Sequence, residues 1–69
     1  MRADLYHIIS ETTEDRFDET ESLEDAVRIA RSVAAEGAAG DPVSIEHRGK
    51  VIRQFVLTSD GRVAEQEIR

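Results

Sequence analysis

Residues 22–37 read Ser-Leu-Glu-Asp-Ala-Val-Arg-Ile-Ala-Arg-Ser-Val-Ala-Ala-Glu-Gly, and they carry the clearest structural pattern in the chain. Its apolar side chains recur at spacings of three and four residues, which is typical of an amphipathic helix. The apolar arc carries no charge and consists of Leu23, Ala26, Val27, Ile29, Ala30, Val33 and Ala34. We therefore expect a helix that buries one face against another layer.

The two ends of this helix are marked by capping residues. Ser22 and Asp25 fit a capping box, in which the Ser22 side chain accepts from the Asp25 N–H and the Asp25 side chain reaches back to Ser22. Gly37 suits the left-handed position that ends a helix. The following Asp41-Pro42 confirms the stop, because a residue before proline avoids helical geometry.

Two strands are expected before the helix. Residues 4–10 are rich in aromatic and β-branched types, which favours a strand. Residues 11–15 are polar and indicate a turn. Residues 16–20 contain a lone apolar Phe17, and we interpret them as a short returning strand.

Three strands are expected after the helix. Residues 43–47 alternate apolar and polar types, as a half-buried strand does. Arg48-Gly49 forms a plausible two-residue hairpin loop with a positive φ at the glycine. Residues 50–58 form the strongest strand, the turn at 59–61 follows, and residues 62–68 return as a weaker final strand.

The whole chain, residues 1–69, is therefore expected to form a single α+β domain. One amphipathic helix packs on an antiparallel sheet of three to five strands, in the order β(β)αβββ. A chain this short buries only about 60% of the surface that it exposes when unfolded, so its stability margin is thin.

The longest strands are apolar on both faces, whereas a single helix covers only one face of a sheet. We therefore expect a homodimer, formed through the free face or by edge pairing. Its expected interface residues are Tyr6, Ile8, Val51, Phe55 and Leu57. The alternative is a monomer in which a β-bulge near Arg53-Gln54 changes the side-chain alternation and turns Phe55 inward.

The net charge of −6 argues against binding to nucleic acid or to anionic membranes, since both require a basic surface. Residues 11–25 hold eight acids against the single base Arg16. They indicate either a solvated acidic segment that runs into a helix N-terminus or a docking patch for a basic protein partner or cations. The expected patch consists of Glu14, Asp15, Asp18, Glu19 and Glu21.

No residue pattern indicates catalysis. The chain has no cysteine, which removes disulfides, thiolate zinc sites and thiol nucleophiles. His7 and His47 could approach each other and, with Glu46, form a pH-sensitive or metal-binding cluster, although structural roles are favoured. The acidic segment lacks the glycine of a calcium loop, and Arg16 and Phe17 interrupt its spacing.

We therefore expect no catalytic residue, no cofactor and no metal, and a non-enzymatic interaction or accessory module. One alternative is a nucleic-acid-binding module that uses a basic strip of the sheet. That strip consists of Arg48, Lys50, Arg53 and Arg62, and ordinary cross-strand charge pairing also explains it. The other alternative is a small ligand-binding protein or enzyme with a pocket at the dimer interface.

A cytoplasmic location is expected from the absence of targeting signals. No stretch approaches the roughly 20 apolar residues that span a bilayer. The N-terminal sequence has neither the apolar core nor the small-residue cleavage site of a signal peptide.

Two short motifs carry a family resemblance. They are Phe17-x-x-Thr20-x-Ser22-x-Glu24-x-Ala26 and His47-Arg48-Gly49-Lys50-Val51-Ile52. Over residues 4–58 the chain resembles small prokaryotic domains of unknown function with a hairpin–helix–hairpin layout. The motifs are a helix cap and a turn, so the resemblance implies a fold and transfers no functional residue. The expected strand at 62–68 goes beyond the usual pattern of these domains.

Overall fold

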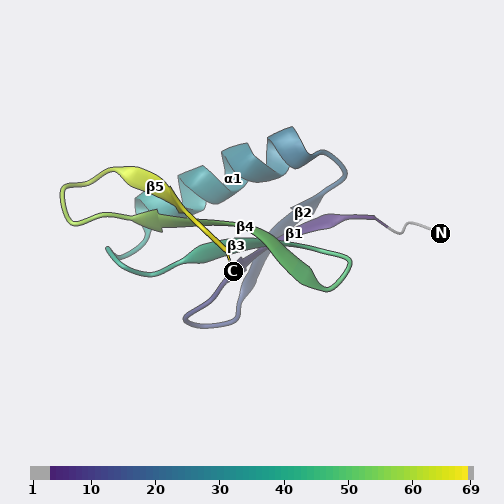
Figure 1. Ribbon diagram of the computed structural model, residues 1–69, viewed down its shortest axis with the longest axis horizontal. Helices are drawn as coiled ribbons and strands as arrows, with labels where there is room; N and C mark the ends of the chain where they lie inside the picture. The colour runs from purple at the N-terminus through teal and green to yellow at the C-terminus, as the bar shows by residue number, and fades with distance from the viewer. Residues whose placement is uncertain (1–3, 69) are drawn as a thin grey trace.

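The computed structural model describes residues 4–68 of the 69-residue chain. One helix lies along one face of a five-stranded antiparallel sheet (Figure 1). The elements in chain order are β1 (Tyr6–Ser10), β2 (Arg16–Thr20), α1 (Leu23–Glu36), β3 (Val43–His47), β4 (Lys50–Leu57) and β5 (Val63–Gln66). The expected α+β class and element order are confirmed, and the segment at 16–20 is a strand.

The strands lie side by side in the order β2-β1-β3-β4-β5. The β1–β2 hairpin forms one part of the sheet, and the β3–β4–β5 meander forms the other. The two parts join where β1 pairs with β3, and α1 connects them along one face. The strands β1, β4 and β5 are shorter than expected, because residues 4, 5, 58, 62, 67 and 68 lie outside the ladders.

The core lies between α1 and the sheet. On the helix side, Ala26, Ala30 and Ala34 are almost completely buried, and their small side chains let the helix approach the strands closely. The sheet contributes larger side chains from its three central strands. These are Ile8, Val43, Ile45 and Phe55. The alanine-rich face expected from the sequence is therefore the face that packs on the sheet.

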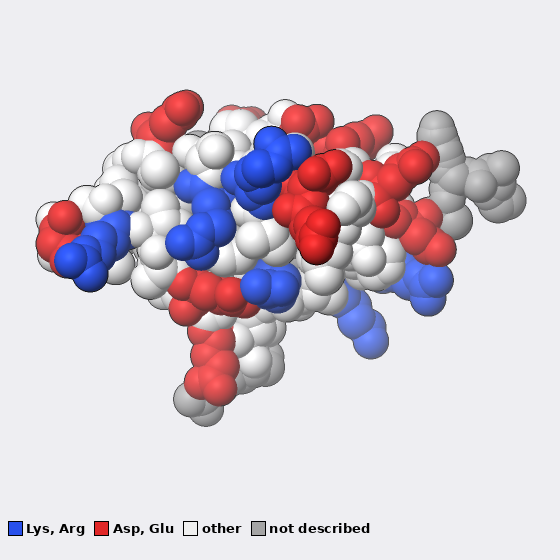
Figure 2. Space-filling view, turned by 90° about the horizontal axis from the view of Figure 1, so that it is seen from above, with Lys and Arg blue, Asp and Glu red and all other residues white. Residues whose placement is uncertain are grey.

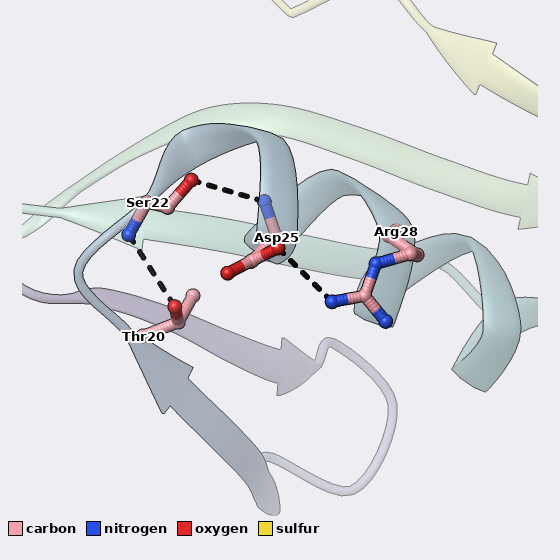
Figure 3. A network of polar contacts seen from close by, with 4 residues as sticks. All are labelled: Thr20, Ser22, Asp25 and Arg28. Carbon is pink, nitrogen blue, oxygen red and sulfur yellow. Dashed lines mark hydrogen bonds and ion pairs between the residues drawn. The ribbon is translucent and has the colours of Figure 1, made fainter.

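The helix begins at a cap that matches half of the expected capping box (Figure 3). The Ser22 side chain accepts from the Asp25 N–H at 3.3 Å, as expected. The Ser22 N–H instead donates to the Thr20 hydroxyl at 3.3 Å, and the Asp25 carboxylate accepts from Arg28 at 3.0 Å. The expected return bond from Asp25 to Ser22 is therefore wrong. Aspartate is one methylene shorter than the glutamate of a full box, and Thr20 takes the Ser22 N–H in its place.

The turns differ from expectation at one position. Gly37 has an extended backbone (φ −93°, ψ −169°), so the expected left-handed helix end is wrong. At the β3–β4 hairpin, Arg48 and Gly49 both have positive φ, 56° and 79°. A two-residue loop with this geometry matches the twist of the strands on either side, and the expected turn is confirmed.

Two register shifts interrupt the ladders. Between β1 and β2, Ile8 lies opposite Asp18 and Ile9 opposite Arg16, which leaves Phe17 without a partner. Between β3 and β4, a second shift leaves Ile52 without a partner. Each extra residue forms a bulge, which changes the side-chain alternation of its strand. A bulge next to Arg53-Gln54 was the alternative left open by the sequence, and the structure places it at Ile52.

Candidate interaction surfaces

The five expected interface residues do not share a free face. Ile8 and Phe55 are each 0% exposed and lie in the core beneath α1, so their assignment to an interface is wrong. Tyr6 also packs against this core, and its ring stacks on that of His47, with 4.2 Å between centroids. Leu57 lies on the same side, because it pairs with Val63, which packs against the core.

Val51 is the exception, because the bulge at Ile52 places it on the face of the sheet opposite the helix. Paired residues of antiparallel strands share a face, and Val51 pairs with Glu46, which in turn pairs with His7. No helix or strand among residues 4–68 covers this side. We call it the uncovered face, and it consists of His7, Ile9, Ser44, Glu46, Val51, Gln54 and Val56.

The polar groups at the centre of the uncovered face bond to one another. The Ser44 hydroxyl donates to Glu11 at 2.5 Å and accepts from the Gln54 amide at 2.9 Å, which explains why Ser44 is fully buried. Towards the other end of the strands, His7 Nδ1 lies 3.4 Å from a Glu19 carboxylate oxygen. Sequence reasoning assigned Ile9 and Val56 to the covered faces of their strands, because side-chain alternation alone does not show which face the helix covers.

The two histidines lie on opposite faces of the sheet. His7 belongs to the uncovered face, whereas His47 pairs with Tyr6 and lies on the side of the helix. The hypothetical cluster of both imidazoles with Glu46 is therefore not formed. Within residues 4–68, no three side chains of the metal-ligating types are grouped so that they could hold an ion.

The acidic residues lie along an edge of the sheet rather than on one face. Glu14 and Asp15 belong to the β1–β2 turn, Asp18 and Glu19 to the edge strand β2, and Glu21 to the connection into α1. Asp18 pairs with Ile8 and Glu19 with His7, so their side chains point to opposite faces. Viewed from the helix side, acidic surface gathers towards the end where α1 begins (Figure 2). We call Asp15, Asp18, Glu19 and Glu21, together with the unpaired side of β2, the acidic edge.

A hollow of about 240 Å³ lies next to the acidic edge, at the C-terminal end of α1. It is lined by Phe17, Val33, Glu36 and Gly37. Phe17 is 49% exposed, although it is one of only three aromatic residues in the chain. The sequence signal for this feature was the single apolar residue in an acidic strand, but the hollow also needs the helix end to be placed beside it.

The expected basic strip is divided among separate ion pairs. Arg48 binds both Asp4 oxygens, at 2.9 and 3.1 Å, and Arg53 binds Glu65 on the neighbouring strand. These bonds hold the pKa of the Asp4 and Glu65 carboxyls below their ordinary values. Arg62 lies 3.8 Å from Asp60. Ordinary charge pairing therefore accounts for three of the four basic residues of the expected strip.

No helix among residues 4–68 is both long enough and apolar enough to cross a membrane. The resemblance to small prokaryotic domains remains a prediction. No protein-family model, no curated protein and no solved structure matches this chain.

Proposed function

We propose that this chain is a non-enzymatic interaction module that associates with a second copy of itself through the uncovered face. The observation that carries the proposal is a five-stranded sheet with a helix on one side only. The opposite side carries the half-buried apolar side chains of Ile9 and Val51, next to Val56, which is only 9% exposed. Apolar side chains left on the free side of a sheet favour a second layer.

The size of the uncovered face suits a weak dimer. The five strands hold 27 residues, and at about 3.3 Å of rise and 4.8 Å of spacing per residue they give a face of roughly 430 Å². Two copies would bury roughly 860 Å², which is below the standard range for stable interfaces and in the range of weak, transient ones. The expected association is therefore transient.

The polar groups at the centre of this face already have partners, whereas His7 Nδ1 is buried and has no hydrogen bond within residues 4–68. Ser44, Gln54 and Glu11 already satisfy one another within the chain. A second copy that covers them does not have to supply new hydrogen bonds, so the usual cost of burying unpaired polar groups is small.

Pairing of two copies through β2 is disfavoured by charge. An antiparallel β2–β2 pair would bring Asp18 and Glu19 of one copy next to the same carboxylates of the other. Like charges placed directly opposite in a sheet are destabilising. The uncovered face, which holds acidic, neutral and apolar side chains together, is the better surface for self-association.

Sedimentation over a concentration series up to about millimolar tests the proposal. We expect the mass to rise from 7.7 kDa towards twice that value. Because each copy carries a net charge of −6, added salt should strengthen the association by screening the repulsion.

A matched pair of variants locates the interface. Val51→Glu places a charge on the uncovered face, whereas Ala35→Glu places the same charge on an exposed helix position. We expect Val51→Glu to abolish the rise in mass and Ala35→Glu to leave it unchanged. A 7.7 kDa species at every concentration and salt level would contradict the proposal.

A further inference from the structure

A second surface, the outer side of β2, is built to accept another strand. β2 is an edge strand, and its inner side pairs with β1. No strand of residues 4–68 pairs with its outer side. An edge strand presents unpaired N–H and C=O groups, with which an extended segment of another chain can pair.

One main-chain N–H of this edge, that of Glu19, is hydrogen-bonded to a side chain of the same strand. The Glu19 N–H donates to a carboxylate oxygen of Asp18 at 2.8 Å. To pair with the Glu19 N–H, an incoming strand must displace the Asp18 carboxylate from it. A neutral strand would then leave that carboxylate without a hydrogen-bond partner. A lysine or arginine on the incoming strand can bind Asp18 instead, which leaves the Glu19 N–H available for main-chain pairing.

An apolar anchor point lies beside this edge. Phe17 is the extra residue of the β2 bulge, so its side chain is taken out of the regular alternation and lines the hollow with Val33 and Gly37. Bulges commonly redirect a side chain in this way. A hollow of about 240 Å³ is large enough for one aliphatic or aromatic side chain of an incoming segment.

The acidic side chains around the Phe17 hollow favour a basic partner segment. Asp15, Asp18, Glu19 and Glu21 lie along the edge against the single base Arg16, and Glu36 lies on the rim of the hollow. This acidic surround is complementary to a basic segment and repels another copy of β2.

We propose that the acidic edge binds an extended basic segment of a partner protein by strand addition to β2, with one apolar side chain of that segment in the Phe17 hollow. This site uses the outer side of β2, and of its acidic residues only Glu19, which pairs with His7, also borders the uncovered face. Strand addition to β2 therefore does not require self-association. The main chain of β2 supplies the pairing groups, the carboxylates supply the preference for basic residues, and Phe17 fixes the position along the strand.

The probe is a synthetic peptide of about eight residues that alternates lysine with valine and has blocked ends. Titration into the isotope-labelled full chain is followed by amide chemical shifts. We expect the largest changes at residues 16–21, Val33 and Gly37. A control peptide with glutamate in place of lysine should cause none, and salt should weaken the lysine peptide.

Two pairs of variants separate this site from general attraction to an acidic protein. Phe17→Ala should weaken peptide binding about tenfold, whereas Ile52→Ala, at the other exposed bulge, should change it less than about twofold. Asp18→Ala should likewise weaken the lysine peptide more than Glu67→Gln does. Circular dichroism spectra and thermal unfolding confirm that each variant is folded.

The outcomes distinguish this proposal from the dimer. Shift changes confined to β5 or to the uncovered face, or equal effects of Phe17→Ala and Ile52→Ala, would overturn the strand-addition site. A rise in sedimentation mass without peptide, which becomes larger when salt is added, supports self-association through the uncovered face and does not test the acidic edge. Peptide binding that is weakened by salt and mapped to residues 16–21 concerns the acidic edge alone.

Discussion

Ile8 and Ile9 are neighbours on the same strand and of the same residue type, but they lie on the two faces of the sheet. Ile8 is 0% exposed beneath the alanines of α1, whereas Ile9 is only half-buried on the uncovered face. The difference shows that neither residue type nor strand propensity decides burial in this protein. For these two residues the alternation of β1 and the position of the helix decide it, and in β4 the bulge at Ile52 also contributes.

The sharpest test of the two faces is the pair Ile8→Ala and Ile9→Ala. Ile8→Ala removes a fully buried side chain and leaves a cavity, so we expect a loss of about 2–5 kcal/mol in the free energy of unfolding. Ile9→Ala should cost about 1 kcal/mol or less. Urea denaturation measures both.

A chain of this size has only about 3–10 kcal/mol of stability, so Ile8→Ala can leave too little folded protein to measure. Ile8→Val, with an expected loss of about 0.5–1.5 kcal/mol, then takes its place. Equal losses for Ile8 and Ile9 variants would show that the helix does not define the core as described.

The next test concerns how closely the helix approaches the sheet. Ala30 is 0% exposed, so Ala30→Leu forces a larger side chain into a filled space and should cost about 1–3 kcal/mol. Ala35→Leu makes the same change on the exposed side of the helix and should be nearly neutral. Thermal unfolding compares the two, and a stabilising Ala30→Leu would reveal unfilled space under the helix.

Removing the cap at the start of the helix should lower the free energy of unfolding by less than the core substitutions do. Ser22→Ala removes the acceptor of the Asp25 N–H and should destabilise the protein by about 1 kcal/mol. Ser22→Asp restores an acceptor and should recover most of the loss. Ser32→Ala, at an exposed position within the helix, is the matched control and should have almost no effect.

The smallest effect is expected at the Arg53–Glu65 pair, on the covered side. Because Arg53 lowers the pKa of Glu65 in the folded state, this pair stabilises the protein above the unfolded-state pKa of about 4.3. That contribution is lost as the pH falls through the folded-state pKa. Both side chains are partly exposed, so the coupling at pH 7 should be only about 0.5 kcal/mol.

A double-mutant cycle measures this coupling without counting the other contacts of Arg53. The variants are Arg53→Met and Glu65→Gln; Arg53→Met also removes the guanidinium that lies over the Phe55 ring, but this loss occurs in both arms of the cycle and cancels. The coupling should vanish at about pH 2, where the carboxyl is protonated. A coupling energy that persists at about pH 2 would show that the pair interacts through packing and not through charge.

Local patterns predicted the elements well. The helix bounds and the strand at 43–47 follow from periodicity and end signals that lie within the segments themselves. The same patterns did not predict which face of β4 is buried. Strict alternation puts Val51 with Phe55, but the bulge at Ile52 separates them, and a bulge depends on the register with the partner strand.

The surfaces were predictable only in part for the same reason. The acidic residues were found directly from composition, but their arrangement along an edge depends on β2 being the outermost strand. The hollow next to Phe17 requires the end of α1 to lie beside β2, a contact between segments that no local pattern contains. The histidines were separated by the pairing register, which places His7 opposite Glu46 instead of His47.

The pairing of β1 with β3 has a consequence for how the chain folds. The hairpin β1–β2 and the meander β3–β5 each form from residues that are close in sequence, whereas Ile8 and Ile45 meet across more than half of the chain. Closing that long loop costs entropy before any contact compensates for it. We therefore expect the pairing of β1 with β3 to limit the folding rate. Until these two strands pair, β1 and β3 would be exposed to solvent while the outer strands are already formed.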